Sequence, residues 1–332
     1  MLNEIQKAFK GKRIVIAGDL VADQFLHGTI SRVSREAPVF ILKHDQTDTR
    51  AGAAANAAVN VASLGGVPHL IGLVGSDESA GLMMAYLAAN GVDIGNIVVQ
   101  NDRRTTTKVR VLAGQHYAAR QQVIRIDYDG SEEMSKNSRD ELIRRLTDAS
   151  READAIILSD YSYGVVNEEL FQAAHEASNG RQIPLVVDSR FGLDKFRGAT
   201  SATPNQEEVE QLIGPDLTNE KCEMLRERLE METLLVTRGN QGMLLFEKGK
   251  DAFELPAVGS KEPVDVTGAG DTVIATFALA LAAGIAPRVA ARVANHAGGI
   301  VVMKKGTASV TIDELVDSIK TVEPTETFSS IA

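Results

Sequence analysis

Hydrophobic residues along the chain form two alternating patterns. Short apolar runs that end at a glycine or a polar residue are typical of strands buried on both faces of a parallel sheet. Longer segments of helical spacing, several of them closed by glycine, are typical of helices. The predicted strands lie at 13–18, 69–74, 155–159, 184–188 and 234–237. The predicted helices lie at 52–64, 79–89, 168–178 and 206–213. This alternation predicts an α/β fold with a doubly wound, mostly parallel sheet and helices on both faces.

Two segments do not fit this alternation. Residues 25–49 alternate loosely between apolar and polar positions, and residues 105–112 and 122–128 resemble a pair of strands. We therefore expect a small β lid outside the main sheet, formed by about 24–50 and 104–128.

The stretch 264–283 carries the strongest chemical signal. A turn of small residues, Gly268–Gly270, precedes Asp271, and a long apolar run follows. The first turn of a helix has unpaired N–H groups and a partial positive charge, and glycine lets the backbone approach a ligand closely. The pattern predicts a helix that begins near Asp271 and binds phosphate or another oxyanion at its start, with Asp271 accepting a proton from a hydroxyl. The alternative is a plain turn with Asp271 as a helix cap.

Polar residues follow the predicted strands at their carboxyl ends, where doubly wound sheets bind ligands. These residues are Asp19, Asp23, Asp160, Asp188, Asn205 and Thr237-Arg238-Gly239. Their number favours a binding site over solvated loops, and Asp19 and Asp23 suit a ligand rich in hydroxyl groups. Asn56 lies within a small-residue helix and must face a cavity or bond to another helix. Asn205 and Glu208 form either a capping box or a site for phosphate and magnesium-bound water.

A basic segment coincides with the second part of the expected lid. No acidic residue lies between positions 103 and 125, which contain Arg103, Arg104, Lys108, Arg110, Arg120 and Arg125. In a chain of net charge −10, this local surplus suits an anionic substrate such as a sugar phosphate. The alternative is an exposed strand kept soluble by its charges.

Composition narrows the classes of function. The 332 residues have a formal net charge of −10, which argues against nucleic-acid and anionic-membrane partners. The single cysteine, Cys222, excludes an intramolecular disulfide and suits a reducing cytoplasm. The N-terminal residues are too polar for a secretory signal, and the longest apolar run, 273–286, is too short to cross a bilayer. The sequence has no phosphate-binding loop motif, dinucleotide glycine motif or zinc-ligand cluster. We therefore expect a cytoplasmic protein with a small-molecule ligand.

Two longer motifs resemble those of the ribokinase-like, PfkB-type sugar kinases. The family's C-terminal signature, D-T-x-G-A-G-D, is similar to Asp265–Asp271, with Val266 in place of the first threonine. The N-terminal signature, G-G-x-x-N, is similar to Gly52–Asn56, with Ala53 in place of the second glycine.

Two shorter motifs extend the resemblance. N-x-x-E corresponds to residues 205–208, and T-R-G corresponds to residues 237–239. The four motifs occur in the family's order, and the resemblance implies a ribokinase-like kinase domain over residues 11–320.

The resemblance implies transfer of the γ-phosphoryl of MgATP to a sugar hydroxyl beneath the β lid. The catalytic positions would be Asp271 and the main-chain amides of Gly268, Ala269 and Gly270. The sugar would be held by Asp19, Asp23, Gly52 and Asn56, and a substrate phosphate by Lys108 with Arg110 or Arg120. The ATP site would comprise Asn205, Glu208, Thr237, Gly239 and Asn295, with Glu208 reaching Mg²⁺ through water. A monovalent cation such as K⁺ and a homodimer formed through the lid are further implications.

Within this family, the chain resembles kinases that phosphorylate D-glycero-β-D-manno-heptose 7-phosphate at O1, a step towards ADP-heptose and the lipopolysaccharide core. The resembling stretches are G-D-L-V-A-D (18–23), S-R-V-S-R-E-A-P-V (31–39), T-K-V-R-V-L (107–112), Q-Q-V-I-R-I-D (121–127), S-D-Y (159–161) and G-I-V-V-M-K-K-G-T (299–307).

Several departures from those kinases keep alternatives open. Tyr163 stands where they have the lysine of D-Y-x-K-G, Ser189-Arg190 follows Asp188 in place of the P-K of D-P-K, and an insertion at about 114–119 lengthens the lid hairpin. The alternatives are a kinase for another sugar, a sugar acid or a nucleoside, and a catalytically silent sugar- or nucleotide-binding regulator. The chain lacks an H-x-G-H motif, so we expect no nucleotidyltransferase domain and a separate nucleotidyltransferase in the same pathway.

Overall fold

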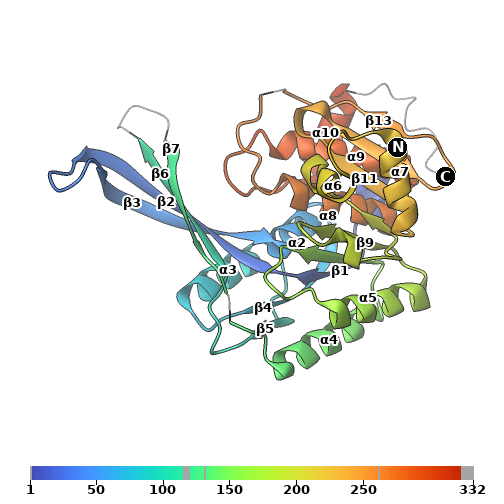
Figure 1. Cartoon of the computed structure of the whole chain (residues 1–332), viewed down its shortest axis with the longest axis horizontal. Coiled ribbons are helices and arrows are strands. Elements are labelled where there is room, and N and C mark those ends of the chain that lie inside the picture. Colours follow the sequence, from blue (N-terminus) through green and yellow to red (C-terminus); the bar gives the residue numbers. More distant parts are fainter. Residues whose placement is uncertain (1, 115–119, 131, 261, 323–332) are drawn as a thin grey trace.

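The structure is a computed structural model that describes residues 2–114, 120–130, 132–260 and 262–322. Within these residues, nine strands form one large sheet (Figure 1). In spatial order they are β13 (Phe253–Leu255), β12 (Met243–Glu247), β11 (Thr233–Thr237), β10 (Ser201–Ala202), β9 (Leu185–Ser189), β8 (Ala155–Asp160), β1 (Arg13–Gly18), β4 (Val67–Val74) and β5 (Ile97–Val99). The strands from β11 to β5 are parallel, whereas β12 and β13 continue the sheet in antiparallel fashion. The predicted fold class is confirmed.

Helices cover both faces of this sheet. One layer consists of α1 (Leu2–Phe9), α2 (Ala54–Ser63), α3 (Glu78–Ala89), α8 (Ala269–Ala282), α9 (Pro287–Val301) and α10 (Ile312–Val322). The other layer consists of α4 (Lys136–Ser150), α5 (Glu168–Arg181), α6 (Gln206–Ile213) and α7 (Asn219–Arg228). In β1, Ile14 and Ile16 pack into the first layer, and Val15 and Ala17 pack into the second. Successive side chains of a strand point to opposite faces, so this unbroken apolar run needs cover on both sides.

Two predicted helix boundaries differ from the structure. α2 begins at Ala54 and not at position 52, because Gly52 and Ala53 still pair with β2 as the end of a strand. The helix expected near Asp271 begins at Ala269. The apolar pattern also gave no prediction of β12 and β13, of which β13 is the edge strand and β12 lies between it and β11.

α8 is the most important helix for the site. It packs against α2 and α9 and is buried from Asp271 to Ala280, which explains its almost continuous apolar sequence. In the described part of the chain, no helix combines the length and the apolar character needed to cross a membrane.

A second, smaller sheet extends away from the main body (Figure 1). Within the described residues it has four strands, in the order β3 (Phe40–Ala53), β2 (Leu20–Val33), β6 (Thr107–Gly114) and β7 (Gln121–Tyr128). A single residue, Asp19, separates the end of β1 from the start of β2, so the chain passes directly from the central strand into the second sheet. These strands include most of the segments expected to form the β lid. The predicted insertion lies almost entirely outside the described residues, which omit 115–119.

Candidate active site

Asp271, in the first turn of α8, lies at the centre of the site. It is 2% exposed. The amide of Asn56 donates to one carboxylate oxygen at 2.8 Å, and the hydroxyl of Tyr161 donates to the other at 2.7 Å. Burial raises the pKa of Asp271 to about 6, against the lowering effect of these two hydrogen bonds. A carboxylate of this kind is largely ionised at neutral pH and can accept a proton.

The start of α8 has the geometry of an anion site. Gly268 is its N-cap residue, with φ of 77°, and a Cβ there would lie 2.5 Å from the amide nitrogen of Asn56. Glycine is therefore favoured by both the backbone conformation and the available space. Among the residues that the structure describes, no side chain caps the start of this helix. The alternative interpretation of the sequence made Asp271 a helix cap. In the structure its carboxylate contacts Asn56 and Tyr161 and does not cap the helix.

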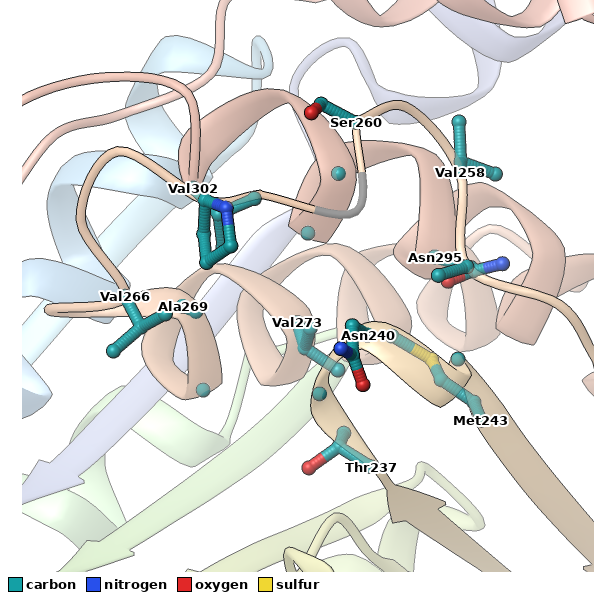
Figure 2. A pocket seen from close by; sticks show the side chains of 17 residues that line it. Thr237, Asn240, Met243, Val258, Ser260, Val266, Ala269, Val273, Asn295 and Val302 are labelled. Carbon is teal, nitrogen blue, oxygen red and sulfur yellow. The ribbon is translucent and has the colours of Figure 1, made fainter.

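A pocket lies against the same helix start (Figure 2). Its walls come from the end of β11, the short helix η2 (Gly239–Gln241), α8 and α9, and most of its lining is small or apolar. The predicted nucleotide residues Thr237, Gly239 and Asn295 line it, together with Ala269 and Gly270. The amide of Asn295 donates at 2.7 Å to a backbone carbonyl in the loop after β13, which fixes one wall. Such an apolar slot with few polar groups suits a nucleobase and its sugar.

Asn205 and Glu208 lie at the start of α6 and form the capping box that the sequence left open. The N–H of Glu208 donates to the Asn205 side chain at 2.9 Å, and the N–H of Asn205 donates to the Glu208 carboxylate at 2.8 Å. Asn205 also forms a β-bridge with Thr237, which brings the helix start next to the pocket. Neither residue lines the pocket itself.

A second carboxylate, Asp188, lies near Glu208 at the end of β9. Burial raises the pKa of Asp188 well above its usual range, and the charges of Glu208 and Asp271 raise it further. Burial also raises the pKa of Glu208. Among the described residues, no group of three or more His, Cys, Asp or Glu side chains could hold a metal ion alone. Mg²⁺ commonly keeps several waters and takes one or two carboxylates plus substrate phosphates, so Glu208 and Asp188 fit that kind of site.

Asp19 lies between β1 and β2 and is 1% exposed. Its carboxylate accepts hydrogen bonds from the backbone N–H groups of Tyr161, Tyr163 and Val165, at 2.8, 3.1 and 3.1 Å. Burial raises its pKa to about 6, while these hydrogen bonds lower it. The structure therefore places Asp19 beneath the 161–165 turn, with both of its oxygens occupied by protein donors.

Asp23, on β2, has a different environment. Arg110 forms an ion pair with one carboxylate oxygen, and the hydroxyl of Thr307 donates to the other at 3.0 Å. Gly52, on the neighbouring strand, leaves the space beside this carboxylate open, because a Cβ there would lie 2.6 Å from an Asp23 oxygen. Asp23 also raises the pKa of Asp271 through its charge, so the two carboxylates lie in the same site.

Lys108 is the most available of the three cations predicted to bind a substrate phosphate. It is 8% exposed, and its ammonium lies 5.9 Å from the ring centre of Tyr161 and 5.6 Å from that of Tyr163. Among the described residues, this ammonium has no ion-pair or hydrogen-bond partner. Burial lowers its pKa, and the charge of Arg190 lowers it further. An ammonium without a partner in a nearly closed space favours an anionic ligand.

The other two predicted cations already have carboxylate partners. Arg110 pairs with Asp23, and Arg120 pairs with Asp45 at 2.5 Å. Arg120 directly precedes β7, whose first residue pairs through β6 with Gly28 on β2. Gly28 lies roughly 17 Å along β2 from Asp23, at about 3.3 Å per residue. The structure thus brings Lys108 and Arg110 to the site and leaves Arg120 towards the far end of the second sheet.

Three residues of the site were not predicted individually from the sequence. Tyr161 contacts Asp271, Thr307 contacts Asp23, and Arg190 lies close enough to Lys108 to lower its pKa. Tyr161 and Thr307 occur in stretches that already resembled the heptose kinases, S-D-Y and G-I-V-V-M-K-K-G-T, which was the available signal. Arg190 was noted only as a departure from that pattern.

Comparison with known proteins agrees with this geometry. The model of the pfkB family carbohydrate kinases matches residues 18–314. The chain is 39% identical over 313 residues to the protein named Bifunctional protein HldE of Hahella chejuensis, which covers 92% of this chain and 63% of that protein. It is 40% identical over 312 residues to the protein of the same name from Chromohalobacter salexigens, with the same two coverages. The chain thus spans less than two thirds of the length of these relatives.

Solved structures show the same fold. Arabidopsis thaliana ribokinase complexed with ribose and ATP has a TM-score of 0.71 and 21% identity, over 94% of this chain and 99% of that chain. Escherichia coli phosphofructokinase-2 in complex with substrates and products has a TM-score of 0.77 and 17% identity, with the same coverages. The chain belongs to the pfkB family of carbohydrate kinases.

Proposed function

We propose that the enzyme transfers the γ-phosphoryl of MgATP to O1 of D-glycero-β-D-manno-heptose 7-phosphate, a step in the synthesis of ADP-heptose. The observation that carries the transfer is the buried carboxylate of Asp271 in the first, uncapped turn of α8, beside the pocket that suits a nucleotide. The resemblance to heptose kinases and the relatives named HldE support the choice of sugar.

The chemical step needs one proton acceptor and a group of fixed donors. The sugar hydroxyl gives its proton to Asp271 as its oxygen forms a bond to the γ-phosphorus. The bond from that phosphorus to the β–γ bridging oxygen breaks, and ADP leaves. Main-chain N–H groups of Gly268, Gly270 and Asp271 would stabilise the charge on the transferred group, because they are oriented before the reaction. The N–H of Ala269, also predicted for this role, donates to the backbone carbonyl of Val266 at 3.2 Å. When Mg²⁺ is bound, it supplies further positive charge to the phosphates, and Glu208 and Asp188 orient its water ligands.

The substrate would lie between the start of α8 and the second sheet. Asp23 and Gly52 border the space for the sugar hydroxyls, and Asn56 faces it from α2. Asp19 supports this space through the 161–165 turn, from which its carboxylate accepts three N–H groups. Thr237, Gly239 and Asn295 would contact ATP directly, while Asn205 would act through the start of α6. The dependence on a monovalent cation stays a prediction.

The phosphate already present on the sugar would bind to Lys108. Its ammonium is buried beside Tyr161 and Tyr163 and lacks a protein partner among the described residues. Arg190, which stands in place of the lysine of the D-P-K motif, adds a second positive charge from the end of β9. Two neighbouring cations from different elements, β6 and the end of β9, are well suited to a dianionic phosphate monoester.

A homodimer formed through the second sheet belongs to the same proposal. Every residue of β7 is exposed, and this strand forms one edge of its sheet. It carries the large apolar side chains Val123, Ile124, Ile126 and Tyr128, each more than 40% exposed. Exposed edge strands with apolar side chains commonly pair with another chain. A cytoplasmic location, where ATP is supplied, and the use of the product by a nucleotidyltransferase are the remaining parts of the proposal.

A substrate panel tests the choice of sugar. ADP release would be measured with heptose 7-phosphate, the same heptose without phosphate, fructose 6-phosphate, ribose, a 2-keto-3-deoxy sugar acid and adenosine. We expect the highest kcat/KM for heptose 7-phosphate, at least about 10-fold above the free heptose, with ³¹P NMR showing a phosphate at the anomeric position. A preference for a free sugar, a sugar acid or a nucleoside would support the alternative kinases. ATP binding without turnover on any acceptor would support the regulator.

A further inference from the structure

We propose that Asp19 and Tyr161 form a positioning unit for the proton acceptor: Asp19 fixes the 161–165 turn, and the turn holds the Tyr161 hydroxyl on Asp271. This inference rests on the proposed phosphoryl transfer and adds two residues to it. Neither residue would touch the transferred phosphoryl group, and both would act through the orientation and charge of the Asp271 carboxylate.

The first part of the unit is the contact between Asp19 and the turn. The three N–H groups that reach Asp19 belong to alternate residues, Tyr161, Tyr163 and Val165. The residues between them, Ser162 and Gly164, have φ of 64° and 90°. Alternation of this kind turns successive N–H groups towards one point and forms a concave anion site in the backbone. The Asp19 carboxylate occupies that site and holds the turn in shape.

The turn has a conformation that needs such support. Ser162 adopts a left-handed backbone conformation, which is unfavourable for a residue with a side chain. Its N–H donates to the side chain of Asp160 at 2.9 Å, so a second carboxylate also stabilises the turn. A buried, ionised Asp19 therefore organises a strained loop, and a neutral side chain of similar size would leave three buried N–H groups with a weaker acceptor.

The second part is the contact between Tyr161 and Asp271. The hydroxyl donates to one carboxylate oxygen at 2.7 Å, while Asn56 holds the other at 2.8 Å. Burial and the charge of Asp271 raise the pKa of the Tyr161 phenol well above its usual range, so the hydroxyl stays a donor at all working pH values. With one donor on each oxygen, the carboxylate cannot rotate freely, and its remaining lone pairs keep a fixed direction.

This arrangement has a consequence for the pH dependence of the enzyme. Hydrogen bonds to an ionised carboxylate lower its pKa, so loss of the Tyr161 hydroxyl raises the pKa of Asp271. Asp23 on β2 and Asp188 on β9 also face Asp271 and favour its protonated form, whereas Lys108 on β6 favours the ionised form. Because these groups stay in place in a Tyr161 variant, the shift reports the hydroxyl alone.

The test uses Tyr161→Phe, which removes one oxygen and keeps the ring beside Lys108, with Tyr86→Phe on α3 as the matched control. For Tyr161→Phe we expect kcat to fall about 10- to 100-fold at pH 7 with KM changed less than about 3-fold, and the acid limb of the kcat profile to move up by about one pH unit. Activity should recover partly at higher pH. Unchanged kcat and an unchanged acid limb would overturn the proposal, and so would a loss of activity with no shift of the limb.

A second variant tests the role of Asp19. Asp19→Asn should lower kcat in the same direction, and in the Tyr161→Phe background it should lower kcat by no more than about 2-fold further, because it acts through the tyrosine. Losses that multiply in the double variant would show that Asp19 acts separately. If Asp19→Asn does not fold, as judged by circular dichroism, the Tyr161→Phe measurements decide the proposal.

A readout without turnover separates this inference from the proposed function. Carboxyl ¹³C NMR of aspartate-labelled protein, with the Asp271 signal assigned by its absence in Asp271→Asn, gives the pKa of that group directly. An enzyme that turns over none of the tested acceptors would count against the proposed function. Even in that case, a higher Asp271 pKa in Tyr161→Phe than in the wild type would support the positioning unit. Equal pKa values in the two proteins would reject it.

Discussion

The start of α8 and the second sheet are built in opposite ways. The residues around Asp271 come from distant parts of the chain and are packed between the helix layers, with Asn56 and Tyr161 fixing both carboxylate oxygens. In the second sheet, by contrast, the whole of β7 is exposed, and the site residue Lys108 has no fixed partner among the described residues. Under the proposed function, the phosphoryl chemistry would belong to the main body of the fold, and substrate choice and assembly would belong to the second sheet. Four predictions test that division.

The largest effect is expected at Asp271. Asp271→Asn keeps the size of the side chain and removes the proton acceptor, so turnover should fall about 100-fold or more for every acceptor sugar. ATP binding, measured by calorimetry, should remain within a few-fold of the wild type. Near-normal turnover in a folded variant would contradict the assignment of Asp271 as the proton acceptor.

A smaller and more selective effect is expected at Lys108. Lys108→Met keeps most of the length and removes the charge, so KM for a sugar phosphate should rise about 10-fold or more, while turnover of a free sugar should change little. Lys43→Met, at an exposed position on β3 of the same sheet, is the matched control. Arg120→Met should have a weaker effect than Lys108→Met, because Arg120 is paired with Asp45. An equal loss for free and phosphorylated sugars would place Lys108 in the chemistry rather than in substrate choice.

The pH dependence of the wild type should reflect the same division. Asp271 must be ionised to accept a proton, and burial raises its pKa to about 6. Activity should therefore be nearly full at pH 8 and should fall about 10-fold for each pH unit below about 6. The limb should have the same position for every acceptor sugar, as measured from kcat between pH 5 and 8.5. A limb that moves with the sugar would point to a group of the second sheet.

The smallest effect on turnover is expected at β7. Ile124→Asp places a charge on the exposed edge strand and should convert a dimer into a monomer, as measured by light scattering. We expect kcat to change less than about 3-fold, because the residues around Asp271 come from elsewhere in the chain. A monomeric wild-type protein would contradict the dimer directly.

The sequence was informative about elements and less informative about contacts. Continuous apolar runs predicted the parallel strands, because strands buried on both faces need such runs. The G-A-G-D motif predicted the helix start at α8. β13 escaped prediction because it is short and only partly buried, whereas β12, which is largely buried, was not identified from its apolar run.

The contacts within the site depend on pairs of residues far apart in the sequence. Asn56 was expected to face a cavity or bond to another helix, and its bond to Asp271 does join α2 to α8, but the partner itself was not predicted. Tyr161, which reaches Asp271 from the end of β8, was not predicted individually. Local patterns do not contain such pairings, since the packing of the helices decides them. The same reason explains why Arg110, predicted to hold a phosphate, is engaged by Asp23.

The passage from the central strand to the second sheet is a single residue long. β1 ends at Gly18 and β2 begins at Leu20, so no flexible linker separates the two sheets. A shift of the second sheet relative to the main sheet would therefore displace Asp19 and the backbone amides that donate to its carboxylate. One of these amides belongs to Tyr161, so under the proposed function sugar binding against the second sheet would reach the hydrogen bond on Asp271.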